Sequence, residues 1–96
     1  MPPDAKPLTD AQRQALCQIM YRAFLEIRSL GSSGTEQAAG LADAFHNLPN
    51  DLWRDDFSLT FFRDAFVGNY QAKYPRSGGV FDYVAMVNEI IAMEDH

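Results

Sequence analysis

An acidic residue and a histidine stand three positions apart near the middle of the chain, at Asp43 and His46. On a helix this spacing places both side chains on one face, and Glu36 lies two turns earlier on about the same side. Carboxylate and imidazole groups bind divalent metal ions, so Glu36, Asp43 and His46 form a candidate metal site. A complete site needs a further ligand, and His96 is the only other histidine. The alternative is a local role, in which His46 bonds to Asp43 or interacts with the end of its helix.

A second group of carboxylates, Asp51, Asp55 and Asp56, surrounds Trp53 and Arg54. Two neighbouring carboxylates can perform acid–base catalysis when burial raises the pKa of one of them. This segment is polar, however, and Asp56 is placed to cap the next helix, so binding is favoured over catalysis. Tryptophan and arginine dominate many protein interfaces, which predicts an interaction surface at Trp53, Arg54 and Asp55. The alternative is that Trp53 is buried beneath the connector as part of the core.

Several functional classes are not supported by the sequence. It contains no nucleophile elbow, zinc-protease motif, Cys-x-x-Cys pair or phosphate-binding loop, so we expect no catalytic activity and no cofactor. The net charge is -5 and the basic residues are scattered, which argues against nucleic acid and against a basic membrane anchor. No apolar run approaches the roughly 18 residues of a membrane span. We expect a soluble, cytoplasmic protein.

The elements that position these residues are predicted to be helices. Apolar periodicity and proline or glycine stops predict helices over about 9–30, 35–48, 58–74 and 77–96, with a short helical turn near 49–56. Thr9 and Gln12 match a capping box at the first start. The fold class is therefore all-α, with four main helices in a small bundle or in two packed helical hairpins. Three prolines make residues 1–8 a flexible tail, and residues 9–96 form a single helical domain.

Helical spacing also predicts which residues face the core. In the first helix these are Leu16, Ile19, Met20, Ala23, Phe24, Ile27 and Leu30. In the third helix they are Leu59, Phe62, Phe66 and Tyr70. The single cysteine, Cys17, has apolar neighbours and is expected to be a small buried side chain.

The last helix carries two adjacent apolar stripes. One contains Val80, Val84, Val87 and Ile91, and the other contains Tyr83, Met86, Ile90 and Met93. Together they cover about half of the circumference, whereas a helix packed on one side needs about a third. The helix is therefore either central in the fold or shared with a second chain.

Three functional hypotheses follow. The first is a non-catalytic interaction protein that self-associates as a homodimer, with Tyr83, Met86, Ile90 and Met93 at the shared face. The second is a small acidic inhibitor of the immunity or antitoxin type, which would mask a basic effector with a patch of Asp51, Asp55, Asp56 and Asp64. The third is a protein that binds a metal or ligand through Glu36, Asp43 and His46.

Overall fold

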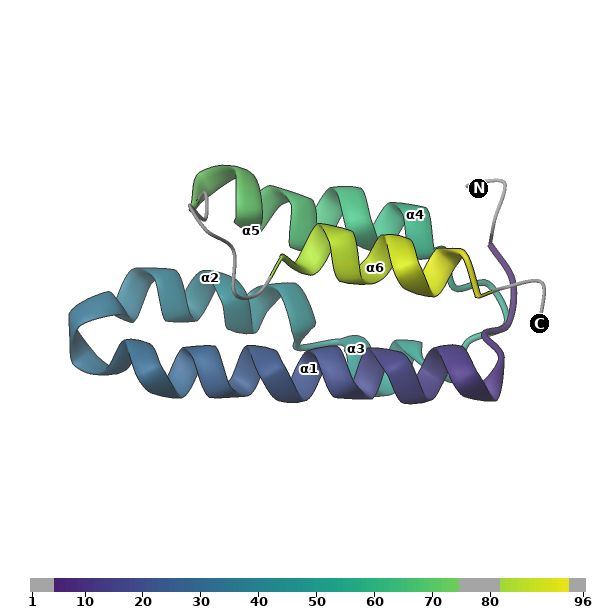
Figure 1. Cartoon of the computed structure of the whole chain (residues 1–96), viewed down its shortest axis with the longest axis horizontal. Helices are drawn as coiled ribbons and strands as arrows, with labels where there is room; N and C mark the ends of the chain where they lie inside the picture. Colours follow the sequence, from purple (N-terminus) through teal and green to yellow (C-terminus); the bar gives the residue numbers. More distant parts are fainter. Residues whose placement is uncertain (1–4, 75–81, 94–96) are drawn as a thin grey trace.

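The computed structural model describes residues 5–74 and 82–93, and within these ranges the regular elements are helices (Figure 1). The first half contains α1 (Asp10–Leu30), the short 3-10 turn η1 (Gly31–Gly34), α2 (Thr35–Phe45) and α3 (Leu48–Asp51). The second half contains α4 (Leu59–Phe61), the π-helical segment η2 (Phe62–Val67), α5 (Gly68–Lys73) and α6 (Tyr83–Ile91). The all-α prediction is confirmed for this part of the chain.

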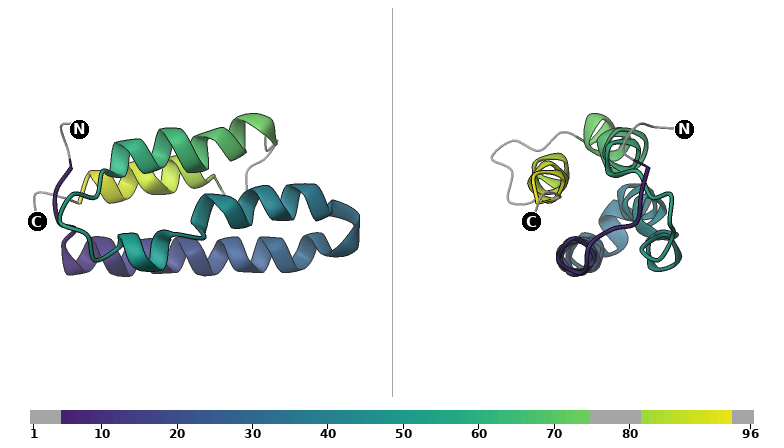
Figure 2. Two further views of the ribbon diagram at one scale, coloured as in Figure 1. Left: turned by 180° about the vertical axis from the view of Figure 1, so that it is seen from behind. Right: turned by 90° about the vertical axis from the view of Figure 1, so that its right-hand side faces the viewer.

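The helices lie in two layers (Figures 1 and 2). Helices α1 and α2 run antiparallel in one layer, and α6 lies beside the continuous 59–73 segment (α4, η2 and α5) in the other. Contacts of α1 with α6, and of α2 with η2 and α5, join the layers. The apolar core between them includes Leu16, Ile19, Ala23, Leu41, Phe45, Leu48, Leu59, Phe62, Val67, Tyr70, Tyr83, Val87 and Ile90.

The capping box predicted at the start of α1 is present. The Thr9 hydroxyl accepts from the Gln12 backbone N–H at 3.1 Å, and the Gln12 side chain accepts from the Thr9 backbone N–H at 3.0 Å. Gln12 is fully buried, and its Nε2 donates to the carbonyl oxygen of Ile90 at 3.2 Å. The same side chain therefore caps α1 and ties it to the end of α6. Gly31 follows α1 with a φ of 55° and a ψ of -145°, a positive-φ conformation that glycine adopts readily.

The prediction of four main helices is wrong, because a wide turn divides the third of them. In the described ranges only α1, α2 and α6 are longer uninterrupted α-helices, while η2 separates α4 from α5 within the 59–73 segment. In η2 the Gly68 N–H reaches the Arg63 carbonyl, five residues back. A Cβ at Gly68 would lie 2.7 Å from that carbonyl oxygen, so glycine fits this turn without a clash. The wide turn makes Val67, rather than the predicted Phe66, the fully buried residue after Phe62.

Residues 5–8 belong to the fold, contrary to the prediction of a flexible tail. The Lys6 N–H donates to the Phe57 carbonyl at 3.0 Å in an isolated antiparallel bridge. Leu8 is only 5% exposed and joins the core. Burial of this apolar side chain and pairing of the extended backbone hold the segment in place. Residues 1–4 of the predicted tail lie outside the described residues.

Helix α6 is shorter in the structure than the predicted range of 77–96. It begins after Asp82, whose side chain accepts from the Ala85 N–H at 3.0 Å and from Gln71 Nε2 at 2.8 Å. This is an N-cap, in which a carboxylate satisfies a free backbone N–H of the first turn. The predicted helical positions 77–81 and 94–96, including Val80, lie outside the described residues.

Replacing Asp82 with alanine is expected to lower the free energy of unfolding by about 1 kcal/mol at neutral pH. The Ala85 N–H, followed by the Gln71 amide, lowers the pKa of Asp82 in the folded chain. A lowered folded pKa stabilises the fold above the unfolded value of about 3.9, and this contribution is lost as the pH falls through the folded pKa. Urea denaturation across the acidic range should show the wild-type and Asp82→Ala curves converging. Asp82→Asn, which keeps an N-cap without the charge, is the control, and a gap between wild type and Asp82→Ala that is as wide at the lowest pH as at neutral pH would contradict the prediction.

Candidate functional site

The predicted metal ligands do not converge. Glu36 Oε1 lies 3.6 Å from Lys73 Nζ, in an exposed ion pair. The His46 ring nitrogen Nδ1 lies 2.9 Å from the backbone carbonyl oxygen of Asp43. The three residues border one open hollow between α2 and α5, but among the described residues no group of three His, Cys, Asp or Glu side chains could hold a metal ion. The structure supports the local role for His46 and corrects the metal prediction.

Trp53 is 73% exposed, which rules out its predicted alternative role as a plug of the core. It lies in the connector between α3 and α4, and the guanidinium carbon of Arg13 is 4.8 Å from the centroid of its ring. Arg54 and Asp55 are also exposed. The three residues predicted as an interaction surface are therefore all accessible in the chain.

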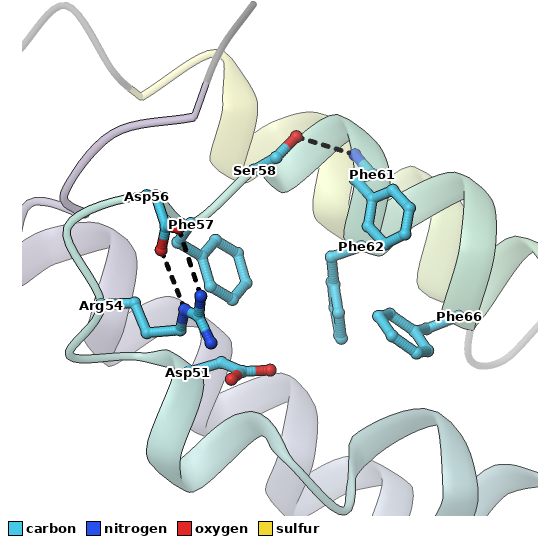
Figure 3. Close-up of a pocket in the computed structure, with 8 residues that line it drawn as sticks. All are labelled: Asp51, Arg54, Asp56, Phe57, Ser58, Phe61, Phe62 and Phe66. Carbon is cyan, nitrogen blue, oxygen red and sulfur yellow. Dashed lines mark hydrogen bonds and ion pairs between the residues drawn. The ribbon is translucent and has the colours of Figure 1, made fainter. Parts of the chain in front are cut away.

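A pocket of about 290 Å³ lies between this connector and the start of the 59–73 segment (Figure 3). We call it the Phe pocket. Its lining residues are Asp51, Arg54, Asp56, Phe57, Ser58, Phe61, Phe62 and Phe66. Four of these are phenylalanines, so its walls are mainly apolar.

Local structure places each aromatic wall. The Ser58 hydroxyl caps α4 by accepting from the Phe61 N–H at 3.1 Å. This bond fixes the position of the Phe61 backbone, and therefore of its side chain, in the first turn of α4. The wide turn in η2 leaves Phe66 partly buried at the border of the core, where its ring makes a T-shaped contact with Phe61, with ring centroids 5.8 Å apart. The ring of Phe62 lies 5.8 Å from Phe66 and 5.9 Å from Phe57. The four rings thus form a connected wall.

The polar side of the pocket carries two carboxylates and one guanidinium. Arg54 donates from Nε and Nη2 to the two oxygens of Asp56, at 2.9 and 3.2 Å. This paired hydrogen bond raises the pKa of Arg54 and lowers the pKa of Asp56. The half-buried carboxylate of Asp51 makes no hydrogen bond or ion pair within the described part of the chain, but its charge also helps to raise the pKa of Arg54. The three side chains together leave one net negative charge beside the phenylalanines.

The acidic patch needed by the inhibitor hypothesis is only partly present. Asp56 is paired with Arg54, and Asp64 accepts from Arg63 Nε at 2.8 Å, which also lowers the pKa of Asp64. Of the four carboxylates proposed for that patch, Asp51 and Asp55 remain without such a partner. This pairing weakens the structural basis for a surface that masks a basic effector.

Most of the predicted dimer face on α6 packs within the chain itself. Tyr83 and Ile90 are 0% and 2% exposed, so they cannot contact a partner in this fold. Met86 and Met93 are half-buried and pack against the core. The buried face of α6 combines residues from both predicted stripes, because Tyr83, Val87 and Ile90 follow helical spacing of four and three.

The main exposed apolar stripe lies on α1 instead. Tyr21, Phe24 and Leu25 are 60%, 53% and 40% exposed. Phe24 was predicted to face the core and Cys17 to be buried, and both are exposed. Contacts of α1 with α2 and α6 bury its opposite face and leave this side uncovered. One signal in the sequence could have revealed this exposed stripe. Apolar residues cover more of the circumference of helical residues 16–30 than packing on one side requires.

Comparison of the chain with protein-family models, with curated proteins and with solved structures found no match. No helix in the described ranges combines the length and apolar character needed to cross a membrane. Functional proposals therefore rest on the chain's own residues.

Proposed function

We propose that this protein is a non-catalytic interaction protein that forms a homodimer through the exposed face of α1. The observation that carries the proposal is the α1 stripe, which we define as Cys17, Tyr21, Phe24, Leu25 and Arg28. Exposed apolar side chains that cluster on one helix face are typical of interaction sites. We also infer that α1, α2, α6 and the 59–73 segment form a small bundle, which leaves the outer face of α1 free.

The spacing of the α1 stripe suits a second helix. Cys17, Tyr21, Phe24 and Arg28 follow intervals of four, three and four residues, the heptad spacing with which two helices pack along their length. Helix α1 has 21 residues and is therefore about 31 Å long, at about 1.5 Å per residue. The stripe can accordingly pack against the same stripe of a second copy.

Charge favours this face over others for a contact between identical chains. Each chain carries a net charge of -5, so two copies repel one another on average. The α1 stripe contains no acidic residue, since the carboxylates of α1 are Asp10 in its first turn and the buried Glu26. An antiparallel arrangement would also keep the two Arg28 side chains at opposite ends of the interface.

The size of the stripe predicts a weak dimer. A fully exposed large apolar side chain offers roughly 200 Å². Tyr21, Phe24 and Leu25 therefore leave about 300 Å² of accessible surface in total. Stable interfaces bury about 800 Å² on each partner, so the stripe alone supports a reversible dimer that depends on concentration.

Light scattering after size-exclusion chromatography over a range of concentrations is the direct test. The mass should rise from 10.8 kDa toward twice that value, and the double variant Tyr21→Ser/Phe24→Ser should remain monomeric. Phe61→Ser is the matched control, because Phe61 is 52% exposed but lies on α4. Alkylation of Cys17, the single thiol, should also slow as the dimer forms. A strictly monomeric wild type, or equal effects of both variants, would overturn the proposal.

A further inference from the structure

We propose that the Phe pocket binds a small organic cation with an apolar body, such as an arylalkylammonium ion. This site is separate from the α1 stripe and does not depend on dimer formation. Its occupant is defined by two properties, an apolar group that fills the aromatic part of the pocket and a positive charge beside Asp51.

The walls fit the apolar part of such a ligand. A volume of about 290 Å³ is close to the lower end of the range of about 300–1,000 Å³ for ligand pockets. It suits a ligand built on one ring. Four phenylalanine rings line the pocket, and transfer of an apolar group from water to these walls is favourable. The faces of aromatic rings also attract a cation.

The charge at the pocket favours a cation over an anion. Both oxygens of Asp56 are engaged by Arg54, so the positive charge of that guanidinium is already balanced by a carboxylate and attracts an anion less strongly. The carboxylate of Asp51 lies at the edge of the pocket on the side opposite Ser58 (Figure 3). An ammonium group could form a direct ion pair with this half-buried carboxylate, which within the described residues interacts with Arg54 through its charge but makes no ion pair.

The π-helical segment is a second structural feature of the same site. It supplies Phe62 and Phe66, two of the four aromatic walls. Wide turns of this kind weaken regular helix geometry and are often found at functional sites. In this chain the turn places Val67 in the fully buried position and leaves Phe66 at the border of the core, where it lines the pocket.

Three probes with one carbon skeleton test the proposal, namely phenylpropylamine as its ammonium ion, phenylpropanol and phenylpropanoate. Titrations followed by two-dimensional NMR should show shifts at the amides of Phe57, Phe61 and Phe66. The ammonium ion should bind most tightly, the alcohol more weakly and the carboxylate most weakly. Asp51→Asn should reduce the affinity for the ammonium ion by about two- to fivefold, to near that of the alcohol.

Asp55→Asn is the matched control, because Asp55 lies in the same connector, is exposed and does not line the pocket. It should leave the affinity for the ammonium ion unchanged, with both variants giving wild-type circular dichroism. Equal binding of the three probes, equal effects of the two variants, or no shift with any probe would each overturn the proposal.

Discussion

Replacing Phe45 with alanine is expected to lower the free energy of unfolding by about 3–5 kcal/mol. Phe45 is the last residue of α2 and is only 1% exposed. Its ring makes edge contacts with Phe62 and Tyr83, with centroids 5.7 and 5.8 Å apart. The substitution therefore leaves a cavity where α2, η2 and α6 meet, and chemical denaturation followed by circular dichroism measures the loss.

Two further variants make this experiment specific. Phe45→Leu keeps most of the buried volume and should cost less than about 2 kcal/mol, so it stays folded and measurable. Phe24→Ala removes the same ring from an exposed position on α1 and should cost less than about 1 kcal/mol. Equal losses for Phe45→Ala and Phe24→Ala would contradict the arrangement of the core.

Replacing Tyr70 with phenylalanine is expected to cost about 1–3 kcal/mol, the range for a buried polar group that is left without its hydrogen-bond partner. The Tyr70 hydroxyl donates to Glu26 Oε2 at 2.7 Å and accepts from Gln37 Nε2 at 2.9 Å. Glu26 and Tyr70 are each 5% exposed. The hydroxyl therefore links α1, α2 and α5 inside the molecule, and its loss removes a donor from a buried carboxyl group.

A double-mutant cycle with Glu26→Met isolates this interaction. Removing both polar groups should cost less than the sum of the single substitutions, because neither partner is then left buried without the other. Tyr74→Phe is the control, since Tyr74 is half-buried and its hydroxyl makes no hydrogen bond within the described residues. It should change the stability by less than about 0.5 kcal/mol. Additive losses in the cycle would disprove the proposed coupling.

The parts of the fold that follow local rules could be predicted from the sequence. Helix α1 begins at the predicted capping box of Thr9 and Gln12 and ends at Gly31, because both signals act within one turn of the helix. The wide turn was missed because the sequence analysis relied on regular helical spacing of apolar residues, and the turn departs from that spacing. Phe62 and Val67 are buried five residues apart, and Gly68 was the only local sign of an altered turn.

The candidate site was predicted only in part, since it depends on contacts between elements. Trp53, Arg54 and Asp55 are exposed, and their role as an interaction surface stays a prediction. Three of the four aromatic walls beside them, Phe61, Phe62 and Phe66, were assigned to a regular helix. The metal prediction failed for a related reason. Glu36, Asp43 and His46 share one side of α2, but a common side does not direct side chains to one point, and Lys73 of α5 pairs with Glu36.

The π-helical segment has a consequence for how this chain can change by insertion and deletion. It holds one amino acid more than a regular α-helix needs between Phe62 and Val67. Deleting Phe66 would leave Phe62 and Val67 four residues apart, so both could remain in the core while α4 and α5 joined into one helix. A one-codon deletion would thus remove a wall of the Phe pocket and keep the buried face. One wall of the proposed binding site could therefore be lost from this chain while Phe62 and Val67 stayed in the core.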